Sequence, residues 1–373
     1  MKLELVATCL FGLEHLLGEE IEALGYERIS TIDGRITFLG DEEAVALSNI
    51  FLRYAERVFI KLGSFRAESF EELFEGTRKL SWPDFIGKDD EFPVKGHSIK
   101  SKLFSIPDCQ AIVKKAVVRS MTERYGITQF PETGVKYQIE FFILNDIATL
   151  MIDTSGVALH KRGYRSHSLG APIRETLAAA IAATSRPREN VLLWDPMCGS
   201  GTIAIEAAMM MMKGIAPGRS RKFAAEDFAF IPKSVWRDAR EEAFDLEKPT
   251  DFQAYASDID PKAVEVALKN TKLAGVSDIV QVFQKDARKI SADGRRGTIV
   301  CNPPYGERLG TQREVEALYR EIGVHFQSLS PWQVYIITSH PQFERFYGRK
   351  ADKVRKLYNG MLPCYLYQFF KNK

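Results

Sequence analysis

Short apolar segments alternate with amphipathic ones from residue 173 onward, and this alternation constrains the fold more than any other feature of the chain. Helical spacing of apolar residues predicts helices at residues 173–183, 202–212, 261–273 and 313–328. Apolar runs of strand length lie between or beside them, at residues 191–194, 252–257, 279–283, 298–301 and 334–338. Strands that alternate with helices predict an α/β fold with a doubly wound, mostly parallel sheet. Two further strands, at residues 353–358 and 362–370, predict an antiparallel hairpin at its end.

Polar residues follow several of these strands at the same end. Asp195, Asp258, Asp286 and Asn302 each stand at or near the carboxyl end of an expected strand. In an open parallel sheet, ligands bind beyond the carboxyl ends of the strands, where the strand order reverses. We therefore expect these four side chains to meet at one ligand site.

The segment from Asp195 to Thr202 has the form of a loop that holds a nucleoside cofactor. Its two glycines, Gly199 and Gly201, form a loose dinucleotide fingerprint together with Ala204. The glycines let the backbone approach the ligand, and the alanine allows the following helix to pack closely on the sheet. The glycine pattern alone also fits an ordinary turn between a strand and a helix.

Two carboxylates extend the cofactor interpretation. Asp258 can accept hydrogen bonds from ribose hydroxyls, and Asp286 can accept one from an adenine amine. A nicotinamide-dependent oxidoreductase is an alternative, because its dinucleotide site uses a similar glycine pattern. A dinucleotide site does not need the third polar position at Asp286, so the oxidoreductase is the less favoured hypothesis.

The segment Asn302-Pro303-Pro304-Tyr305 predicts the chemistry. The two prolines fix φ and remove backbone donors, so nearby carbonyls are held as acceptors. With the side-chain oxygen of Asn302, these carbonyls can bind an exocyclic amine and direct its nitrogen lone pair at an incoming methyl group. Tyr305 can stack on the planar base that carries the amine. We therefore predict methyl transfer to a nitrogen, with these four residues as the catalytic group.

The N-terminal part predicts two smaller α+β units. Residues 1–64 have the β-α-β-α-β order of a ferredoxin-like subdomain, and residues 65–157 contain two expected helices, a strand and a hairpin. A basic connector at residues 158–172 then leads to the α/β part at residues 173–373. We expect the connector to face a polyanion or an active site, although a solvated linker is the alternative.

The composition excludes several classes of protein. The formal net charge is +2, so nucleic-acid contacts must come from local patches rather than from a general excess of positive charge. The five cysteines are scattered without a C-x-x-C pair, which argues against a disulfide framework and a zinc site and predicts a cytoplasmic protein without metal. We find neither a signal peptide nor an apolar run long enough to cross a membrane.

Three more stretches give the chain a resemblance to a known family. They lie at residues 100–110, 159–165 and 171–178, and they accompany the loop after Asp195 and the motif at Asn302. With them, nearly the whole chain resembles the THUMP-domain RNA guanine-N2 methyltransferases, a bacterial group that acts on 23S rRNA and has tRNA-modifying relatives. The resemblance implies a Rossmann-like methyltransferase sheet, a ferredoxin-like and THUMP RNA-binding module before it, and S-adenosylmethionine as the cofactor.

The resemblance also implies roles for individual residues. Cofactor binding would fall to Asp195, Cys198, Gly199, Gly201, Thr202, Asp258 and Asp286. Glu175 and Thr176 would close over the methionine end of the cofactor. Asn302 and Tyr305 would hold the guanine.

Clusters of basic residues are the expected RNA contacts, because phosphate contacts dominate the affinity of proteins for RNA. In the second unit and the connector they are Lys100, Lys102, Lys115, Arg119, Lys161, Arg162 and Arg165. A further basic patch in the insertion before residue 252 consists of Lys213, Arg219, Arg221 and Lys222.

The sequence thus predicts methyl transfer from S-adenosylmethionine to N2 of a guanine in structured RNA, with 23S rRNA as the first candidate and tRNA as the second. Adenine-N6 or protein-glutamine methylation is another hypothesis, because such enzymes share the motif at Asn302; the N-terminal RNA module argues against it. A non-catalytic RNA-binding protein is a third hypothesis. Intact Gly199, Asp258, Asn302 and Tyr305 argue against that one.

Overall fold

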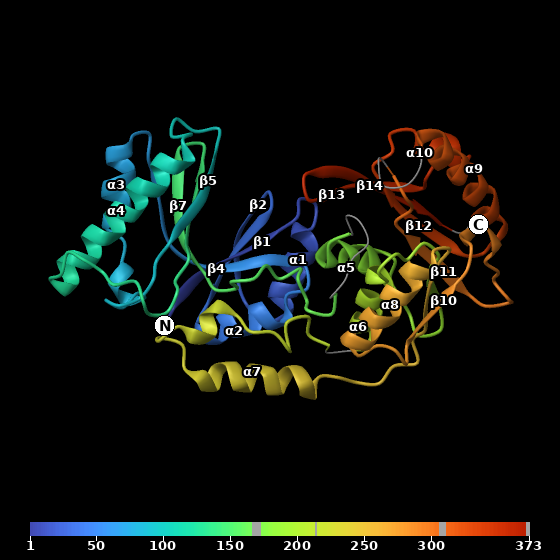
Figure 1. The fold of residues 1–373 in the computed structure, drawn as a ribbon, viewed down its shortest axis with the longest axis horizontal. Helices are drawn as coiled ribbons and strands as arrows, with labels where there is room; N and C mark the ends of the chain where they lie inside the picture. The colour runs from blue at the N-terminus through green and yellow to red at the C-terminus, as the bar shows by residue number, and fades with distance from the viewer. Residues whose placement is uncertain (166–172, 213–214, 306–310, 371–373) are drawn as a thin grey trace.

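The computed structural model describes residues 1–165, 173–212, 215–305 and 311–370. It contains two seven-stranded sheets that lie side by side, one built from the N-terminal part of the chain and one from the C-terminal part (Figure 1). The expected α/β sheet with an α+β module before it is confirmed.

The N-terminal sheet has the strand order β2-β3-β1-β4-β7-β6-β5. Its strands are β1 Leu3–Cys9, β2 Arg28–Ile32, β3 Arg35–Gly40, β4 Ala55–Arg66, β5 Val94–Ile99, β6 Ile139–Leu144 and β7 Ile147–Asp153. Its helices are α1 Glu14–Ala23, α2 Glu42–Phe51, α3 Phe70–Arg78 and α4 Ile106–Tyr125. The long strand β4 pairs with both β1 and β7, so the two expected N-terminal units share one continuous sheet.

The C-terminal sheet has the strand order β10-β9-β8-β11-β12-β14-β13. Its strands are β8 Leu192–Asp195, β9 Ala254–Asp258, β10 Val280–Gln284, β11 Gly297–Cys301, β12 Gln333–Thr338, β13 Lys353–Asn359 and β14 Leu362–Phe369. Its helices are α5 Glu175–Thr184, α6 Thr202–Met211, α7 Lys233–Asp245, α8 Pro261–Ala274, α9 Gln312–Ser328 and α10 Phe343–Tyr347. Strands β8 to β12 are parallel, and β14 and β13 add an antiparallel hairpin. The strand order reverses between β8 and β11, which puts the ends of these two strands at the switch point.

Local sequence signals explain where several helices begin. The side chain of Asp41 accepts a 3.0 Å hydrogen bond from the amide of Ala44 at the start of α2. Ser69 and Glu72 form a capping box at the start of α3. Asp260 caps α8, and the left-handed Gly275 ends it.

The two sheets are joined by a continuous apolar core and by segments that cross between them. Helix α7 belongs to the insertion after α6, yet it packs against α2 of the N-terminal sheet (Figure 1). Nearby, the amide of Gly218 donates a 2.9 Å hydrogen bond to the carbonyl of Ile50. At the other side, the rings of Phe11 and Tyr358 meet edge to face at 5.6 Å. Within the described ranges, no helix has the length and apolarity needed to cross a bilayer.

Candidate active site

The loop between β8 and α6 brings its backbone next to open space. Gly199 and Gly201 both have positive φ, +52° and +80°, which glycine adopts without strain. A Cβ built on Gly199 would meet no atom within 4 Å, so this residue borders a space that a ligand can fill. A Cβ on Gly201 would lie 3.2 Å from Cβ of Ala267, so the second glycine allows α6 and α8 to approach each other.

The carboxylate of Asp258 lies directly beside this loop. Its Oδ2 accepts a 2.9 Å hydrogen bond from the amide of Gly199, and its Oδ1 accepts a 3.0 Å hydrogen bond from the amide of Asp260. The adjacent amide of Cys198 donates to the carbonyl of Ser257 at 3.0 Å. The ends of β8 and β9 are therefore held together by the loop that follows β8.

Buried ionisable groups surround the loop on the sheet side. Asp195 is 1% exposed, and this burial raises the pKa of its carboxyl well above the ordinary range. The hydrogen bond from the amide of Met197 opposes the rise, whereas the negative charge of Asp258 adds to it. Burial likewise raises the pKa of the Cys198 and Cys301 thiols. Burial of this kind disfavours the thiolate form, so neither cysteine has the environment that activates a nucleophilic thiol.

Asp286 stands on the third connection, after β10, and is already paired. Arg288 donates to it from its backbone amide at 2.9 Å and from its guanidinium. The hydrogen bond from Arg288 lowers the pKa of the Asp286 carboxyl against a smaller opposing effect of burial. A carboxylate accepts about four hydrogen bonds, and Arg288 already makes four such contacts with the two oxygens of Asp286. A ligand amine could therefore bind Asp286 only by replacing one of the bonds to this arginine.

The side-chain oxygen of Asn302 is buried, and no described residue donates a hydrogen bond to it. Helix α9 supports the segment that follows, because the hydroxyl of Tyr319 donates a 3.0 Å hydrogen bond to the carbonyl of Pro304. Tyr305 is 3% exposed, with its hydroxyl 3.9 Å from Sγ of Cys364 on β14. A buried acceptor without a donor costs free energy, so the Asn302 oxygen can accept from a group that the described residues do not supply.

Comparisons with known proteins agree with this arrangement. Residues 162–368 match the family described as the RMKL-like methyltransferase domain, residues 4–59 the RlmL ferredoxin-like domain, and residues 67–153 the THUMP domain. A relative from Bacillus subtilis (strain 168), called "Putative RNA methyltransferase YpsC", is 43% identical over 99% of this chain and 96% of its own length. The chain belongs to the THUMP-containing class I RNA methyltransferases.

Two solved structures are similar over the whole methyltransferase. SMU.472, described as "a putative methyltransferase complexed with SAH", is 40% identical with a TM-score of 0.92, over 100% of this chain and 99% of that one. A protein from Listeria monocytogenes, described as a "predicted N6-adenine-specific DNA methylase", is 44% identical with a TM-score of 0.92, over 100% and 97%. S-adenosylmethionine is thus the cofactor of the methyltransferase, and the open space at Gly199 beside Asp258 fits such a group.

Two residues expected at the methionine end of the cofactor are engaged in contacts with other parts of the chain. Glu175 is 1% exposed and pairs with Arg165 at 3.0 Å, while burial raises its pKa. The hydroxyl of Thr176 donates to Glu56 on β4 at 2.6 Å. These contacts tie the start of α5 to the connector and the N-terminal sheet.

The structure corrects the expectation that the connector arginines face RNA. Arg162 is 7% exposed and donates to the carbonyls of Leu159 and Arg53, with Nε 3.6 Å from the fully buried Glu206. Arg165 donates to Glu175 and to the carbonyl of Ile173, so neither guanidinium is open to phosphate. Both arginines therefore make contacts within the protein, and Arg162 links Arg53 of the N-terminal part to Glu206 on α6.

The remaining expected RNA contacts divide into exposed and internal groups. The exposed cations are Lys100, Lys102, Lys115, Arg119 and Lys161, of which Lys102 pairs with Glu68 and Arg119 with Glu123. In the insertion, Arg219 pairs with Glu247 and Arg221 donates to carbonyls of residues 157–159, so both are structural; Lys213 lies outside the described residues.

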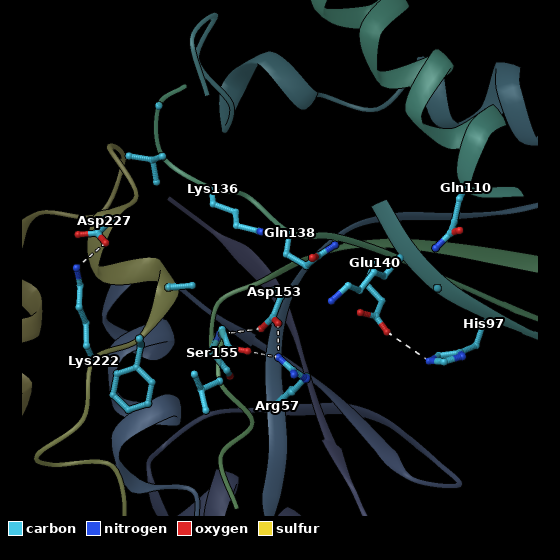
Figure 2. Close-up of a pocket in the computed structure, with 18 residues that line it drawn as sticks. Arg57, His97, Gln110, Lys136, Gln138, Glu140, Asp153, Ser155, Lys222 and Asp227 are labelled. Atoms are coloured by element: carbon cyan, nitrogen blue, oxygen red, sulfur yellow. Dashed lines mark hydrogen bonds and ion pairs between the residues drawn. The ribbon is translucent and has the colours of Figure 1, made fainter. Parts of the chain in front are cut away.

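A cavity of about 1430 Å³ gathers other cations that the sequence left in separate clusters (Figure 2). Lys95 from β5 and Lys222 from the insertion line it together with Arg57, Lys136 and His97. Part of this charge is neutralised locally, since Arg57 contacts Asp153, Lys222 pairs with Asp227 at 2.7 Å, and His97 lies 3.9 Å from Glu140. Lys95 forms no ion pair with a described residue and is exposed. Sequence reasoning missed Arg57 and Lys136 because each is a single cation in an ordinary strand context.

Proposed function

We propose that this RNA methyltransferase transfers the methyl group to N2 of a guanine in structured RNA, with 23S rRNA as the substrate. The observation that carries the proposal is the buried oxygen of Asn302, which has no donor among the described residues. An exocyclic amine is a suitable donor for it, and the position of Asn302 after β11 is at the reversal of the strand order, across from the glycine loop.

The chain contributes orientation to this reaction. Asn302 accepts one hydrogen of the guanine amine and thereby fixes the direction of the nitrogen lone pair. The cofactor supplies a methyl group on a positively charged sulfur. The amine nitrogen forms a bond to the methyl carbon while the carbon–sulfur bond breaks with its electron pair going to sulfur, and a proton leaves the nitrogen for water. Orientation of reactants can supply on the order of 7–11 kcal/mol of the barrier.

Three further groups support the proposal from the cofactor side. Asp258 would accept from the ribose, and the open backbone at Gly199 would border the methionine. Asp286 would accept from the adenine amine in place of one of its bonds to Arg288. The loop at Gly199 also contains residues whose side chains or backbone are buried beneath it and support its conformation, namely Asp195, Cys198, Gly201 and Thr202. The guanine must leave its helix or be presented unpaired. The ring of Tyr305 is 3% exposed and lies in the core, so it supports the segment at Asn302 from the inside and, contrary to the expectation from the sequence, offers no face on which the base could stack.

The N-terminal module supports RNA as the carrier of that guanine. The cavity at Lys95 and Lys222 and the exposed cations of α4 would contact phosphates rather than read bases. Transfer RNA is the second candidate substrate. Adenine-N6 methylation is the competing chemistry, since the same amine geometry is available on adenine and one of the similar structures carries that name.

One experiment tests reaction and substrate together. The purified protein is given labelled S-adenosylmethionine and total RNA from cells that lack the gene, and the RNA is fractionated, digested and analysed by mass spectrometry. We expect N2-methylguanosine in the large-rRNA fraction. The same nucleoside in tRNA would retain the chemistry and change the substrate, whereas N6-methyladenosine would overturn the proposal.

A further inference from the structure

A second pocket lies on the opposite edge of the methyltransferase sheet from the cofactor loop. It has a volume of about 470 Å³ and is lined by the segment after α5 and by residues near the amino ends of β11 and β12. Strand β11 begins at Gly297 in this pocket and ends just before Asn302. At about 3.3 Å per residue, the two sites are roughly 16 Å apart along the strand.

The pocket is strongly and uniformly positive. The cations that line it are Arg186, Arg188, Arg296, Lys353 and Arg355. None of the described residues that line it is acidic, and none of these five side chains forms an ion pair or hydrogen bond with a described residue. This distinguishes it from the larger cavity of Figure 2, where Arg57, His97 and Lys222 have acidic partners.

Strand pairing puts the two cations of β13 on the same face of the sheet as Gln368 and Tyr335. Gln368 on β14 is directly opposite Tyr335 on β12 and Lys353 on β13, and cross-strand partners point to the same face of a sheet. Arg355 is two residues beyond Lys353 and shares that face. Burial raises the pKa of the Tyr335 hydroxyl, and the charges of Arg186, Arg355 and Arg188 oppose the shift, so guanidiniums from two distant segments act on one hydroxyl.

A buried donor in the same pocket has no acceptor. Gln368 is 3% exposed, it lines the pocket, and its Nε2 has no hydrogen-bond partner among the described residues. An amide donor left unpaired in the interior costs about 1–3 kcal/mol. An oxyanion in the pocket would accept from Nε2 and remove this cost.

Helix electrostatics do not account for the cluster. Arg186 and Arg188 follow the carboxyl end of α5, where a cation stabilises the helix dipole. That effect falls off within the last turn and gives no reason for Arg296, Lys353 and Arg355, which come from the sheet. Like charges repel one another, so a bound anion would relieve the repulsion among the five cations.

We propose that this pocket is a binding site for consecutive phosphate groups, remote from the transfer site. A water molecule occupies roughly 30 Å³ of the liquid, so the pocket is larger than a single phosphate group requires. Arginine binds phosphate oxygens through paired N–H groups, and Gln368 adds a neutral donor. The phosphates belong either to the backbone of the RNA substrate or to a free polyphosphate compound. The first alternative rests on the proposed function.

The test compares two double variants of the full-length protein. Arg188→Gln with Arg355→Gln removes charge from the pocket, and Lys248→Gln with Lys272→Gln removes the same charge from exposed positions elsewhere. Binding of a short fluorescein-labelled single-stranded RNA and of inorganic tripolyphosphate is measured at several salt concentrations, after equal thermal midpoints have shown that both variants fold. Because methylation is not the readout, failure of the guanine-N2 proposal would leave this result unaffected.

We expect the pocket variant to bind RNA about tenfold more weakly. The slope of the logarithm of the binding constant against the logarithm of the salt concentration should become shallower by about 1.4, or 0.7 for each lost phosphate contact. In the same variant, tripolyphosphate should no longer compete with the labelled RNA for binding. Weaker tripolyphosphate binding with unchanged RNA binding would identify a free polyphosphate as the ligand. Unchanged binding of both probes, or an equal loss in the control variant, would overturn the proposal.

Discussion

The amide of Gly199 donates a 2.9 Å hydrogen bond to Oδ2 of Asp258, although the two residues belong to different connections of the sheet. The bond fixes the glycine loop against the end of β9 and orients the carboxylate beside the open space at Gly199. One carboxylate therefore both shapes the cofactor loop and offers its remaining lone pairs to a ligand.

Replacing Asp258 by alanine should weaken cofactor binding. Hydrogen bonds to a charged group contribute about 1.5–3 kcal/mol, so the dissociation constant of S-adenosylmethionine should rise roughly 10- to 150-fold. Isothermal titration calorimetry measures this change directly. Asp260→Ser is the matched control, because serine keeps the helix cap of α8 while removing a neighbouring carboxylate. Equal affinities in wild type and Asp258→Ala would remove Asp258 from the site.

Replacing Asn302 by alanine should separate transfer from cofactor binding. The oxygen of Asn302 has no hydrogen-bond partner among the described residues, so its removal breaks no hydrogen bond with them and should leave the fold intact. Misplacing a reactant by about 1 Å can cost about 100-fold in rate, and we expect a fall of that size in single-turnover methylation. Cofactor affinity should change less than about twofold. Asn359→Ala, at the end of β13, provides the control; full activity of Asn302→Ala would contradict the assigned role.

The sequence was informative where function depends on local order. Polar residues at strand ends and glycines before a helix predicted the meeting of Asp258 with the loop at Gly199, because parallel strands present their carboxyl ends at one edge. The strand β2 was missed since all of its residues are exposed, so it carries no alternation of apolar and polar side chains. Helix α7 was missed inside the long insertion, although Trp236, Ala239 and Ala243 give it a buried face.

The sequence was uninformative where function depends on distant segments. Arg162 looked like a surface cation because its neighbours in the chain are basic, yet its partner Glu206 lies on α6. The pocket that contains Arg186, Arg296 and Lys353 likewise forms only once β14 inserts between β12 and β13. A strand order of this kind is set by packing, and the spacing of residues does not reveal it.

Glu206 is the buried acid that Arg53 and Arg162 share, and its removal should destabilise the whole chain. It is fully buried and forms ion pairs with Arg53 at 3.4 Å and with Arg162 at 3.6 Å. It also accepts a 3.0 Å hydrogen bond from the hydroxyl of Tyr164. Glu206→Ala leaves two buried guanidiniums without their acid, a change that costs about 3–5 kcal/mol.

Differential scanning fluorimetry measures this loss. With an unfolding entropy of about 2.1 cal/mol/K per residue, the melting temperature should fall by roughly 4–6 °C. Glu265→Ala is the control, because Glu265 is exposed and pairs only with Lys269 one turn away, and it should shift the midpoint very little. A Glu206→Ala protein as stable as wild type would show that the buried network contributes nothing net.

Glu20 should make stability fall as pH rises toward neutrality. Burial raises the pKa of its carboxyl to about 7, against opposing effects of the Arg53 charge and of the amides of Tyr54 and Arg53. Since the folded pKa exceeds the ordinary value of 4.5, the folded state holds a proton that the unfolded state has released between these two pH values. The free energy of unfolding therefore decreases across this window, by at most about 1.4 kcal/mol per pH unit.

Urea unfolding of wild type and Glu20→Gln, measured between pH 5 and pH 8 in steps of about one pH unit, tests the sign of this dependence. The side chain of Glu20 keeps some exposure, so the slope should stay below its limit. Glutamine cannot titrate, so the variant should lose the downward slope and gain stability relative to wild type as pH rises. Glu19→Gln, at the neighbouring exposed position, should follow the wild-type curve. Parallel curves for wild type and Glu20→Gln would mean that Glu20 is ionised throughout this range in the folded protein.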